Sequence, residues 1–326
     1  MSVENQTSAT DFFIVGFPGL QQNYYGLVGT VFFLVYFFTL VGNAAFLVLF
    51  TTDRNLHKPM YVLTLNLAVS DVLFSTTTLP KIIAKYWFQA GTISFTGCFV
   101  QMACVHYFAT VSSFILLIMA LDRYIAICYP LRYPKIITSD IILILSITSW
   151  VLSIASPIIA VIRAYPQSYC TSHTIIQCFC DLISVTALAC VNQTSQSFSV
   201  LVYAMVVLMV PFVFILLTYC RIIAAVLQIA NTNERLKSLS TCSPQLVIVA
   251  LYFLPRCFVY LAHNVGIKFS TDVRIAIIVL YSLLPPMVNP LIYCLRTKEV
   301  KQSLIKAFRR QHVRIQKMNI VLTLSK

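Results

Sequence analysis

The chain has 326 residues, of which 59% are hydrophobic and 10% are charged. A soluble domain carries about 25% charged residues, so this composition excludes an ordinary water-soluble fold. The formal net charge of +13 could indicate a nucleic-acid-binding protein, but membrane topology and attraction to an anionic inner leaflet explain it better.

Seven apolar segments follow one another along the chain. Five hold no Lys, Arg, Asp or Glu, and two hold one charge each, Asp71 and Arg256. A helix needs roughly 20 apolar residues to cross the hydrocarbon, and the alternative, a closed barrel, would show alternating segments of about 10 residues. The sequence therefore predicts an all-α membrane protein. Its seven-transmembrane helix bundle covers 24–295, with spans at about 24–50, 59–84, 96–128, 140–162, 197–229, 237–263 and 273–295.

The basic residues predict the orientation of these spans. Most of the 23 Lys and Arg residues fall in alternate loops and in 296–326, and positive charge stays on the cytoplasmic side during insertion. We therefore expect a multi-pass plasma-membrane protein with 1–23 extracellular and the C-terminus cytoplasmic. Residues 1–23 show no pattern of a cleavable signal peptide. Two sequons, at Asn5 and Asn192, fall on the expected outer side as glycosylation sites.

A short amphipathic eighth helix is expected after the seventh span, from Thr297 to Arg310. Val300, Leu304 and Phe308 recur there at four-residue spacing beside basic residues, as a helix at the membrane interface requires.

The 11 cysteines divide by compartment. Cys98 begins the third span on the expected outer side, where oxidising conditions permit disulfides. The long loop between spans four and five holds Cys170, Cys178, Cys180 and Cys190. Sequence alone does not determine the connectivity, but we expect one bridge to tie this loop to Cys98. A metal site at Cys178 and Cys180 near His173 is disfavoured, because no tetrahedral ligand spacing is present.

Motifs at the span ends carry a family resemblance. They are LVGN ending at Asn43, LHKPMY from Leu56, LNLAVSD ending at Asp71, MALDRYIAICYPLRY from Met119, LKSLSTC from Leu236 and LLPPMVNPLIYCLRTKEVK from Leu283. In this order they resemble odorant (olfactory) receptors of the rhodopsin-like class A G-protein-coupled receptor family. Pro255 and Leu284-Pro285-Pro286 resemble the fish-like subgroup. Gln245 departs from the family, which usually has His at that position.

The resemblance implies an odorant receptor and not an enzyme. Such a receptor binds a small volatile or water-borne odorant in the outer half of the bundle. It then activates a heterotrimeric stimulatory G protein, which raises cyclic AMP, and it uses no cofactor. The resemblance also implies the disulfides Cys98–Cys180 and Cys170–Cys190, which would leave Cys178 unpaired.

The resemblance assigns G-protein coupling and activation to Asp122, Arg123, Tyr124, Tyr219, Asn289, Pro290 and Tyr293. Arg123 would pair with Asp122 at rest and turn toward backbone carbonyls or a tyrosine when the G protein's tail inserts. Pro290 and Pro255 each remove a backbone hydrogen bond and would kink their spans.

Asp71 lies in mid-span, where ionisable residues are functional candidates. We expect a polar network of Asn43, Asp71, Ser112 and Asn289 at one depth. In the resembled receptors such a cluster holds water or sodium, and carboxylate, hydroxyl and amide oxygens suit a small hard cation. The alternative is a protonated Asp71 that is hydrogen-bonded within the helix packing.

The ligand pocket is expected to be aliphatic with few polar groups. Its predicted lining is Val105, His106, Ala109, Thr110, Tyr203, Val207, Phe253, Arg256, Tyr260 and Val279. Val105 stands where amine receptors of this fold carry Asp, which disfavours a biogenic amine. Arg256 lies too deep to reach water easily. It could bind, with His106, an acidic odorant or another strong acceptor; alternatively, it pairs with the loop residue Asp181.

Three other classes of membrane protein would show patterns of their own. A transporter would show inverted repeats, a channel would need a polar pore-lining face, and an enzyme would need a nucleophile or a cluster of its 5 His residues. The chain has none of these patterns. A rhodopsin-like receptor for another small molecule or a peptide is the nearest alternative.

Overall fold

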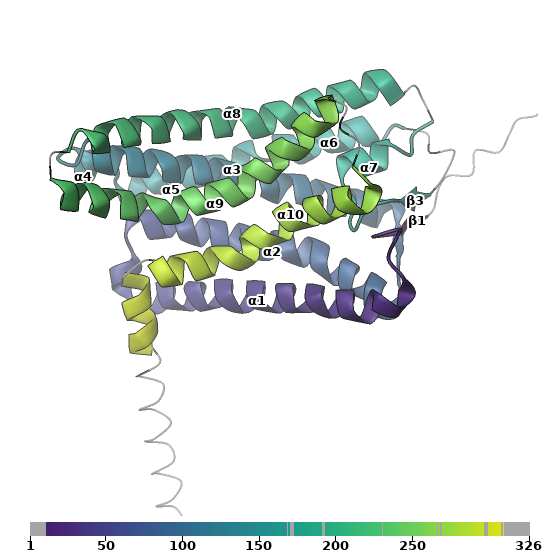
Figure 1. Ribbon diagram of the computed structural model, residues 1–326, viewed down its shortest axis with the longest axis horizontal. Helices are drawn as coiled ribbons and strands as arrows, with labels where there is room; N and C mark the ends of the chain where they lie inside the picture. The colour runs from purple at the N-terminus through teal and green to yellow at the C-terminus, as the bar shows by residue number, and fades with distance from the viewer. Residues whose placement is uncertain are drawn as a thin grey trace, which may run out of the picture.

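The structure is a computed structural model that describes residues 11–307 and 309, apart from 168, 170–172, 191, 192, 230, 266, 268, 297 and 298. The side chains of 193–204, 237, 241, 260, 263–265, 295 and 296 also lie outside the described part. Within the described residues, seven helices are long and apolar enough to cross a membrane. They run side by side along the long axis of the molecule (Figure 1). The predicted fold class is therefore confirmed.

The spans lie within a few residues of their predicted ranges. They are α1 (Tyr25–Thr52), α2 (Pro59–Phe88), α3 (Phe95–Cys128), α5 (Ser139–Leu152) with α6 (Ala155–Ala164), α8 (Gln193–Leu227), α9 (Thr232–Val265) and α10 (Thr271–Arg296). Shorter elements join them: β1 (Asp11–Ile14), η1 (Gln22–Tyr24), η2 (Arg54–Leu56), β2 (Thr92–Ser94), α4 (Tyr133–Ile136), β3 (Thr174–Ile175) and α7 (Leu182–Thr186).

Local chemistry explains several helix starts. Pro59 occupies the first turn of α2, where its missing N–H costs nothing. The Ser94 hydroxyl accepts a hydrogen bond from the Gly97 amide across 3.1 Å and so caps α3. The fourth span is interrupted at Ser153 and Ile154 because Pro157 has no N–H with which to continue the helical ladder. The predicted fourth span is present as Ser139–Ala164, with a short break between α5 and α6.

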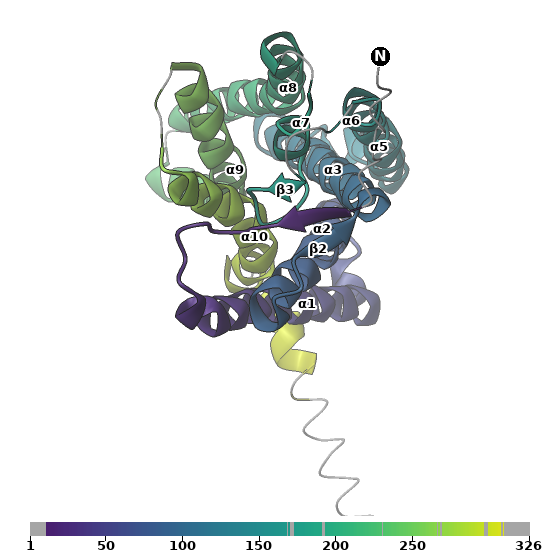
Figure 2. The same ribbon diagram turned by 90° about the vertical axis from the view of Figure 1, so that its right-hand side faces the viewer.

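A three-stranded sheet closes one end of the bundle, which we call the sheet end. β1 pairs antiparallel with β2 and parallel with β3, and Figure 2 shows it crossing this end. Phe12 and Ile14 are almost fully buried, while Asp11 and Phe13 alternate with them and face outward, as the period of a strand requires. The sequence patterns did not predict this sheet.

The opposite end, which we call the α4 end, carries a helical segment at 299–307. Val300 is fully buried there and packs in a cluster with Phe46 and Leu56. Lys58 pairs with Glu299 across 3.7 Å. The apolar face predicted for the eighth helix therefore rests against α1, η2 and the start of α2. Phe308 lies outside the described residues.

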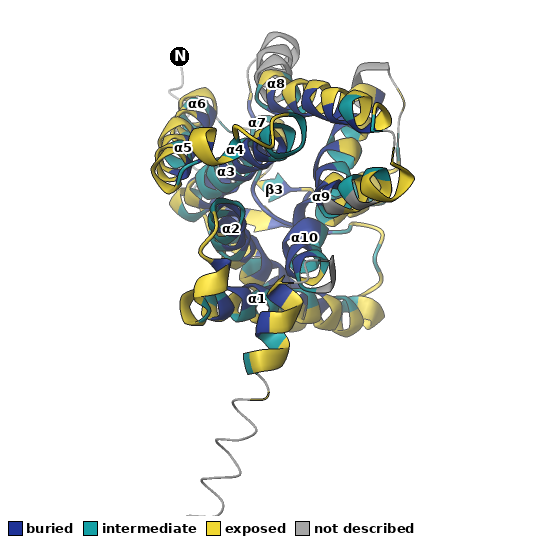
Figure 3. Ribbon diagram, turned by 90° about the vertical axis from the view of Figure 1, so that its left-hand side faces the viewer, coloured by how far each residue is buried: buried dark blue, intermediate teal, exposed yellow. Residues whose placement is uncertain are grey.

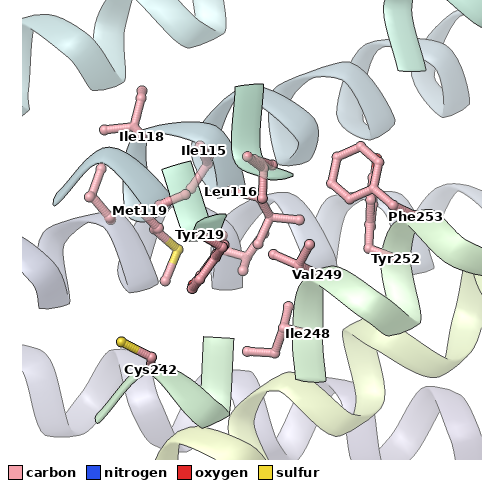
Figure 4. Close-up of a cluster of buried hydrophobic side chains, with 14 of the residues drawn as sticks. Ile115, Leu116, Ile118, Met119, Tyr219, Cys242, Ile248, Val249, Tyr252 and Phe253 are labelled. Carbon is pink, nitrogen blue, oxygen red and sulfur yellow. The ribbon is translucent and has the colours of Figure 1, made fainter. Parts of the chain in front are cut away.

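Burial divides the bundle into an interior and an apolar outer surface. Figure 3 shows exposed positions on the outward faces of the helices and buried ones inside. Leu27 on α1 and Ile162 on α6 are each more than 60% exposed, as lipid-facing residues are. The largest buried cluster draws mainly on α3, α8 and α9, and Figure 4 shows Ile115, Tyr219 and Val249 among its members.

Candidate functional site

A cavity lies between α3, α9, α10 and the loop before α7, in the half of the bundle nearer the sheet end. It has about 750 Å³ of space not occupied by atoms, and small-molecule pockets usually span about 300–1,000 Å³. Its polar lining residues are His106, Thr110, Ser113, Ser156, Asp181, Tyr252, Arg256, Tyr281 and Ser282. Its apolar lining residues are Phe74, Val105, Ala109, Phe179, Val207, Leu208 and Ile278, so the cavity combines the expected apolar surface with more polar side chains than the sequence predicted.

Most of the predicted pocket residues do line this cavity: Val105, His106, Ala109, Thr110, Val207 and Arg256. Phe253 does not, because its side chain is fully buried on the side of α9 that packs against α8, where its ring stacks on Phe212 at 5.0 Å. Val279 packs in the cluster around Phe74, and its neighbour Ile278 faces the cavity instead. The side chains of Tyr203 and Tyr260 lie outside the described residues.

Two tyrosines hold Arg256 in the cavity wall. Its guanidinium lies 3.9 Å from the ring centroid of Tyr252 and 4.7 Å from that of Tyr281, a cation–π arrangement. Its Nη1 donates to the Tyr252 carbonyl across 2.6 Å. The sequence analysis did not identify Tyr252. Its position four residues before Arg256 could have done so, because residues four apart share a helix face.

Arg256 does not pair with Asp181, the alternative left open by the sequence. In the described part of the chain the ion pair within 4 Å joins Lys58 and Glu299. The Tyr252 hydroxyl instead donates to the Ala109 carbonyl across 2.5 Å and lies 3.0 Å from the Ser113 hydroxyl. Tyr252 therefore couples the Arg256 wall of the cavity to α3.

Asp181 is fixed at the cavity rim by two constraints. It follows Cys180, which forms a disulfide with Cys98 with their Cα atoms 5.5 Å apart. Its Oδ1 accepts hydrogen bonds from the Ser184 amide, at 3.2 Å, and from the Ser184 hydroxyl, which together make a capping box for α7. Burial raises the pKa of the Asp181 carboxyl, and the Ser184 bonds and the Arg274 charge oppose that rise.

His106 adds a polar atom that has nothing to bind. It lies on α3 in the cavity wall, and its Nε2 is buried with no hydrogen-bond partner among the described residues. Buried polar side-chain atoms are usually hydrogen-bonded. This nitrogen is therefore available to a molecule in the cavity.

A second, deeper cavity of about 340 Å³ reaches Asp71. Asn289 Nδ2 donates to Asp71 Oδ2 across 2.7 Å, while Asn289 Oδ1 is buried without a partner in the described chain. Ser112 lines the same cavity but its hydroxyl lies 3.0 Å from that of Ser70. Arg256 and Tyr252 line both cavities, so the two cavities adjoin at these side chains.

The expected polar network is only partly assembled around Asp71. Asn43 is buried nearby, but its amide donates to the Thr39 carbonyl at 2.8 Å and to the Pro286 carbonyl at 3.0 Å. A backbone carbonyl in α10 therefore takes the hydrogen bond that the sequence assigned to the carboxylate cluster. Asn289 is the direct partner of Asp71.

Asp122 and Arg123 lie at the end of α3 near α4, but Arg123 does not form the expected pair with Asp122. Asp122 accepts a hydrogen bond from the Tyr133 hydroxyl across 2.9 Å, and Arg123 donates to the sulfur of Met60. A neutral hydroxyl from α4 thus meets the carboxylate, because α4 folds back beside the end of α3. The sequence did not assign Tyr133 this role.

Two predicted tyrosines lie close to this site without hydrogen bonds. The hydroxyls of Tyr219 on α8 and Tyr293 on α10 are buried and have no partner in the described chain. Tyr124 packs its ring against Tyr129, with centroids 5.7 Å apart. Pro290 lies inside α10, against Gly42 of α1.

The cysteines at the sheet end follow the pairing that the resemblance implies, as far as they are described. The Cys98–Cys180 bond is present, Cys178 is free and buried, and Cys190 is disulfide-bonded. Cys170, its implied partner, lies outside the described residues, as do the sequons at Asn5 and Asn192.

Comparisons with known proteins agree with this arrangement. Residues 32–311 match the family model described as olfactory receptor. The chain is 37% identical to olfactory receptor 2AT4 of Homo sapiens, covering 90% of this chain and 92% of that one. It is 32% identical to olfactory receptor 1468 of Rattus norvegicus, covering 94% and 96%. The crystal structure of squid rhodopsin superposes with a TM-score of 0.71 at 20% identity, covering 89% of this chain and 87% of that one, which shows the shared fold.

Proposed function

Because this chain belongs to the olfactory receptor family, whose members are G-protein-coupled receptors and not enzymes, we propose that it binds a small odorant beside Arg256 and activates a stimulatory G protein. The proposal has the sheet end outside the plasma membrane and the α4 end in the cytoplasm. The Cys98–Cys180 disulfide supports this orientation, since disulfides persist in oxidising compartments. The basic residues of the alternate loops support it as well.

The single observation that carries the ligand proposal is the Arg256 guanidinium in the cavity wall. It has no carboxylate partner within 4 Å among the described residues. A guanidinium binds a carboxylate through two parallel hydrogen bonds, and His106 Nε2 offers a further polar contact. An odorant with a carboxylate therefore complements this wall better than an ester, an aldehyde or a hydrocarbon.

At the α4 end, the proposal assigns G-protein contact to Arg123 and its surroundings. The Met60 sulfur is a weak acceptor, so the Arg123 side chain can exchange it for a stronger one at little cost. The partnerless hydroxyls of Tyr219 and Tyr293 are candidate acceptors. Tyr124 and Asp122 would position the arginine, and Pro290 would let α10 bend.

The donor set near Asp71 fits a sodium ion in part. The Asp71 carboxylate, the Ser112 hydroxyl and the partnerless Asn289 Oδ1 line one cavity, and oxygen atoms are the ligands of hard cations. Asn43, bonded elsewhere, would not contribute. A bound sodium ion would supply a positive charge that holds α2, α3 and α10 together.

The test is a cyclic AMP assay in cells that express the full chain, with carboxylic acid, ester, aldehyde and amine odorants. We expect acids to be the strongest agonists and Arg256→Gln to abolish their response. The matched control is Arg163→Gln, which removes the same charge from an exposed site at the end of α6. An Arg256→Gln variant that still responds to every acid would contradict the anchor. Saturable uptake without cyclic AMP would favour a transporter, the alternative of another class.

A further inference from the structure

The ligand cavity holds two side chains of opposite charge that do not neutralise each other. Arg256 enters it from α9, and Asp181 enters from the loop before α7. Among the described residues neither has an ion-pair partner within 4 Å. Both side chains are partly buried, and removing a charge from water without giving it a partner is unfavourable. A ligand that carries both complementary charges would give each of these side chains a partner.

Both charges are held by contacts that a ligand need not supply. The rings of Tyr252 and Tyr281 flank the guanidinium. The Cys98–Cys180 bond and the capping box with Ser184 fix Asp181. Side chains that are already ordered lose little entropy on binding. The Ser184 bonds use Oδ1 of Asp181, and Oδ2 has no hydrogen-bond partner in the described part of the chain, so an acceptor remains for a ligand.

We infer that the receptor's ligand is a small zwitterion, with a carboxylate at Arg256 and a protonated amine at Asp181. This rests on the proposed function of the same cavity and narrows its ligand class. His106 Nε2, which is buried and has no hydrogen-bond partner among the described residues, offers the ligand a further polar contact in the same cavity. The polar side chains of the lining, among them Thr110, Ser113 and Ser282, suit a molecule that dissolves in water.

Ligands with one charge fit less well for a definite reason. A simple carboxylic acid leaves Asp181 uncompensated, and a simple amine leaves Arg256 uncompensated. Val105 offers no charge on α3, so the amine must be met by the loop carboxylate. Specificity of this kind arises because the wrong ligand leaves a buried charge without a partner.

The experiment uses ω-amino acids of increasing length: β-alanine, γ-aminobutyrate and ε-aminocaproate. Caproate and hexylamine are the probes with one charge. Two readouts are taken from the full chain, cyclic AMP in cells and thermal stabilisation of the purified receptor. We expect one ω-amino acid to act at a concentration about tenfold or more below that of caproate, which is the effect of one well-placed buried charge pair.

The decisive variant is Asp181→Asn. Asn is as good a helix N-cap as Asp, so α7 keeps its start while the charge is removed. We expect the potency of the ω-amino acid to fall by roughly tenfold to a hundredfold, and that of caproate to stay or to rise. The matched control is Asp272→Asn at the start of α10, which removes a charge from the same end without touching the cavity. It should change neither potency.

The outcomes separate this inference from the proposed function. If caproate equals or surpasses every ω-amino acid, or if Asp181→Asn weakens both probes alike, the zwitterion is overturned while the receptor function stands. If an ω-amino acid stabilises the purified protein but no probe raises cyclic AMP, the coupling proposal fails and the zwitterion holds. If no probe acts in either readout, the zwitterion is overturned.

Discussion

The side-chain amide of Asn289 in α10 donates a hydrogen bond to the carboxylate of Asp71 in α2 across 2.7 Å, between residues 218 apart in the chain. Both residues are buried. The bond joins two spans, and both residues line the deep cavity together with Arg256. The proposed ligand contact on α9 and the interior polar pair between α2 and α10 therefore line the same cavity.

Replacing Asn289 by Ala should destabilise the receptor, because the buried Asp71 carboxylate loses its direct partner. The expected cost is about 1.5–3 kcal/mol, the usual contribution of a hydrogen bond to a charged group. Thermal unfolding of the purified protein measures it. Asn233→Ala, at an exposed position in the first turn of α9, is the control, and equal melting temperatures for the two variants would contradict the prediction.

Gly42→Ala should also destabilise the bundle, because the added Cβ would lie 2.8 Å from Cγ of Pro290. Overpacking of this kind costs about 1–3 kcal/mol. Gly26→Ala in the same helix meets nothing within 4 Å and should stabilise by about 0.4–1 kcal/mol, since alanine restricts the unfolded chain. The two variants should therefore shift the melting temperature in opposite directions; a shared sign would refute the close contact of α1 with α10.

Cys98→Ser should lower the stability of the sheet end and the response to ligands. The bond closes a loop with a sequence separation of 82 residues, and closure of a loop near this size contributes about 4–5 kcal/mol in the chain-entropy account. It also holds Asp181 at the cavity. Cys220→Ser, at an exposed free thiol, is the control. Thermal unfolding with and without reductant measures the effect. If the Cys98→Ser receptor were as stable as the oxidised parent, the prediction would be contradicted.

Tyr133→Phe should loosen α4, because the Asp122 carboxylate loses the hydroxyl that lies 2.9 Å away. Leaving a buried acceptor unsatisfied costs about 1–3 kcal/mol. Hydrogen exchange of the amides in α4 should become faster. Tyr165→Phe, at an exposed tyrosine near the sheet end, should leave that exchange unchanged. Unaltered protection of α4 in Tyr133→Phe would mean that other contacts hold it.

The contact of residues 299–307 with the rest of the bundle should weaken in acid. The Ser303 hydroxyl donates to Asp53 Oδ2 across 2.6 Å and lowers the pKa of that carboxyl, assisted by the Asn55 amide and the charge of Lys306. A carboxyl group whose folded pKa is depressed contributes stability above its unfolded value, about 3.9. That stability is lost as the pH falls through the folded value.

Hydrogen exchange of 299–307 measured from neutral pH down to acid tests this. After correction for the intrinsic pH dependence of exchange, protection should fall in acid in the parent and change less in Ser303→Ala. The Lys58–Glu299 pair is common to both proteins and cancels in the comparison. Ser303→Thr, which keeps a hydroxyl, should behave like the parent. Identical profiles for the parent and Ser303→Ala would show that Asp53 does not stabilise this helix.

The sequence by itself determined the fold class and the family. Apolar length and the absence of charge identify a membrane span wherever it lies, because the cost of a charge in hydrocarbon does not depend on which helix is next to it. Local motifs such as the one around Arg123 keep their order along the chain. The sequence also identified Arg256, because a single charge in an apolar span is recognised without knowing which helices lie beside it.

Only the tertiary structure decided how the side chains of different helices meet. Sequence placed Phe253 in the pocket and missed Tyr252, because the rotation of α9 depends on its packing against α8, where Phe253 stacks on Phe212. It also paired Arg123 with Asp122, whereas the fold of α4 brings Tyr133 to that carboxylate. Asp181 lines the cavity because the disulfide joins the preceding residue, Cys180, to Cys98 of α3. Each of these contacts joins distant segments, and their free energy depends on a geometry that neither segment encodes alone.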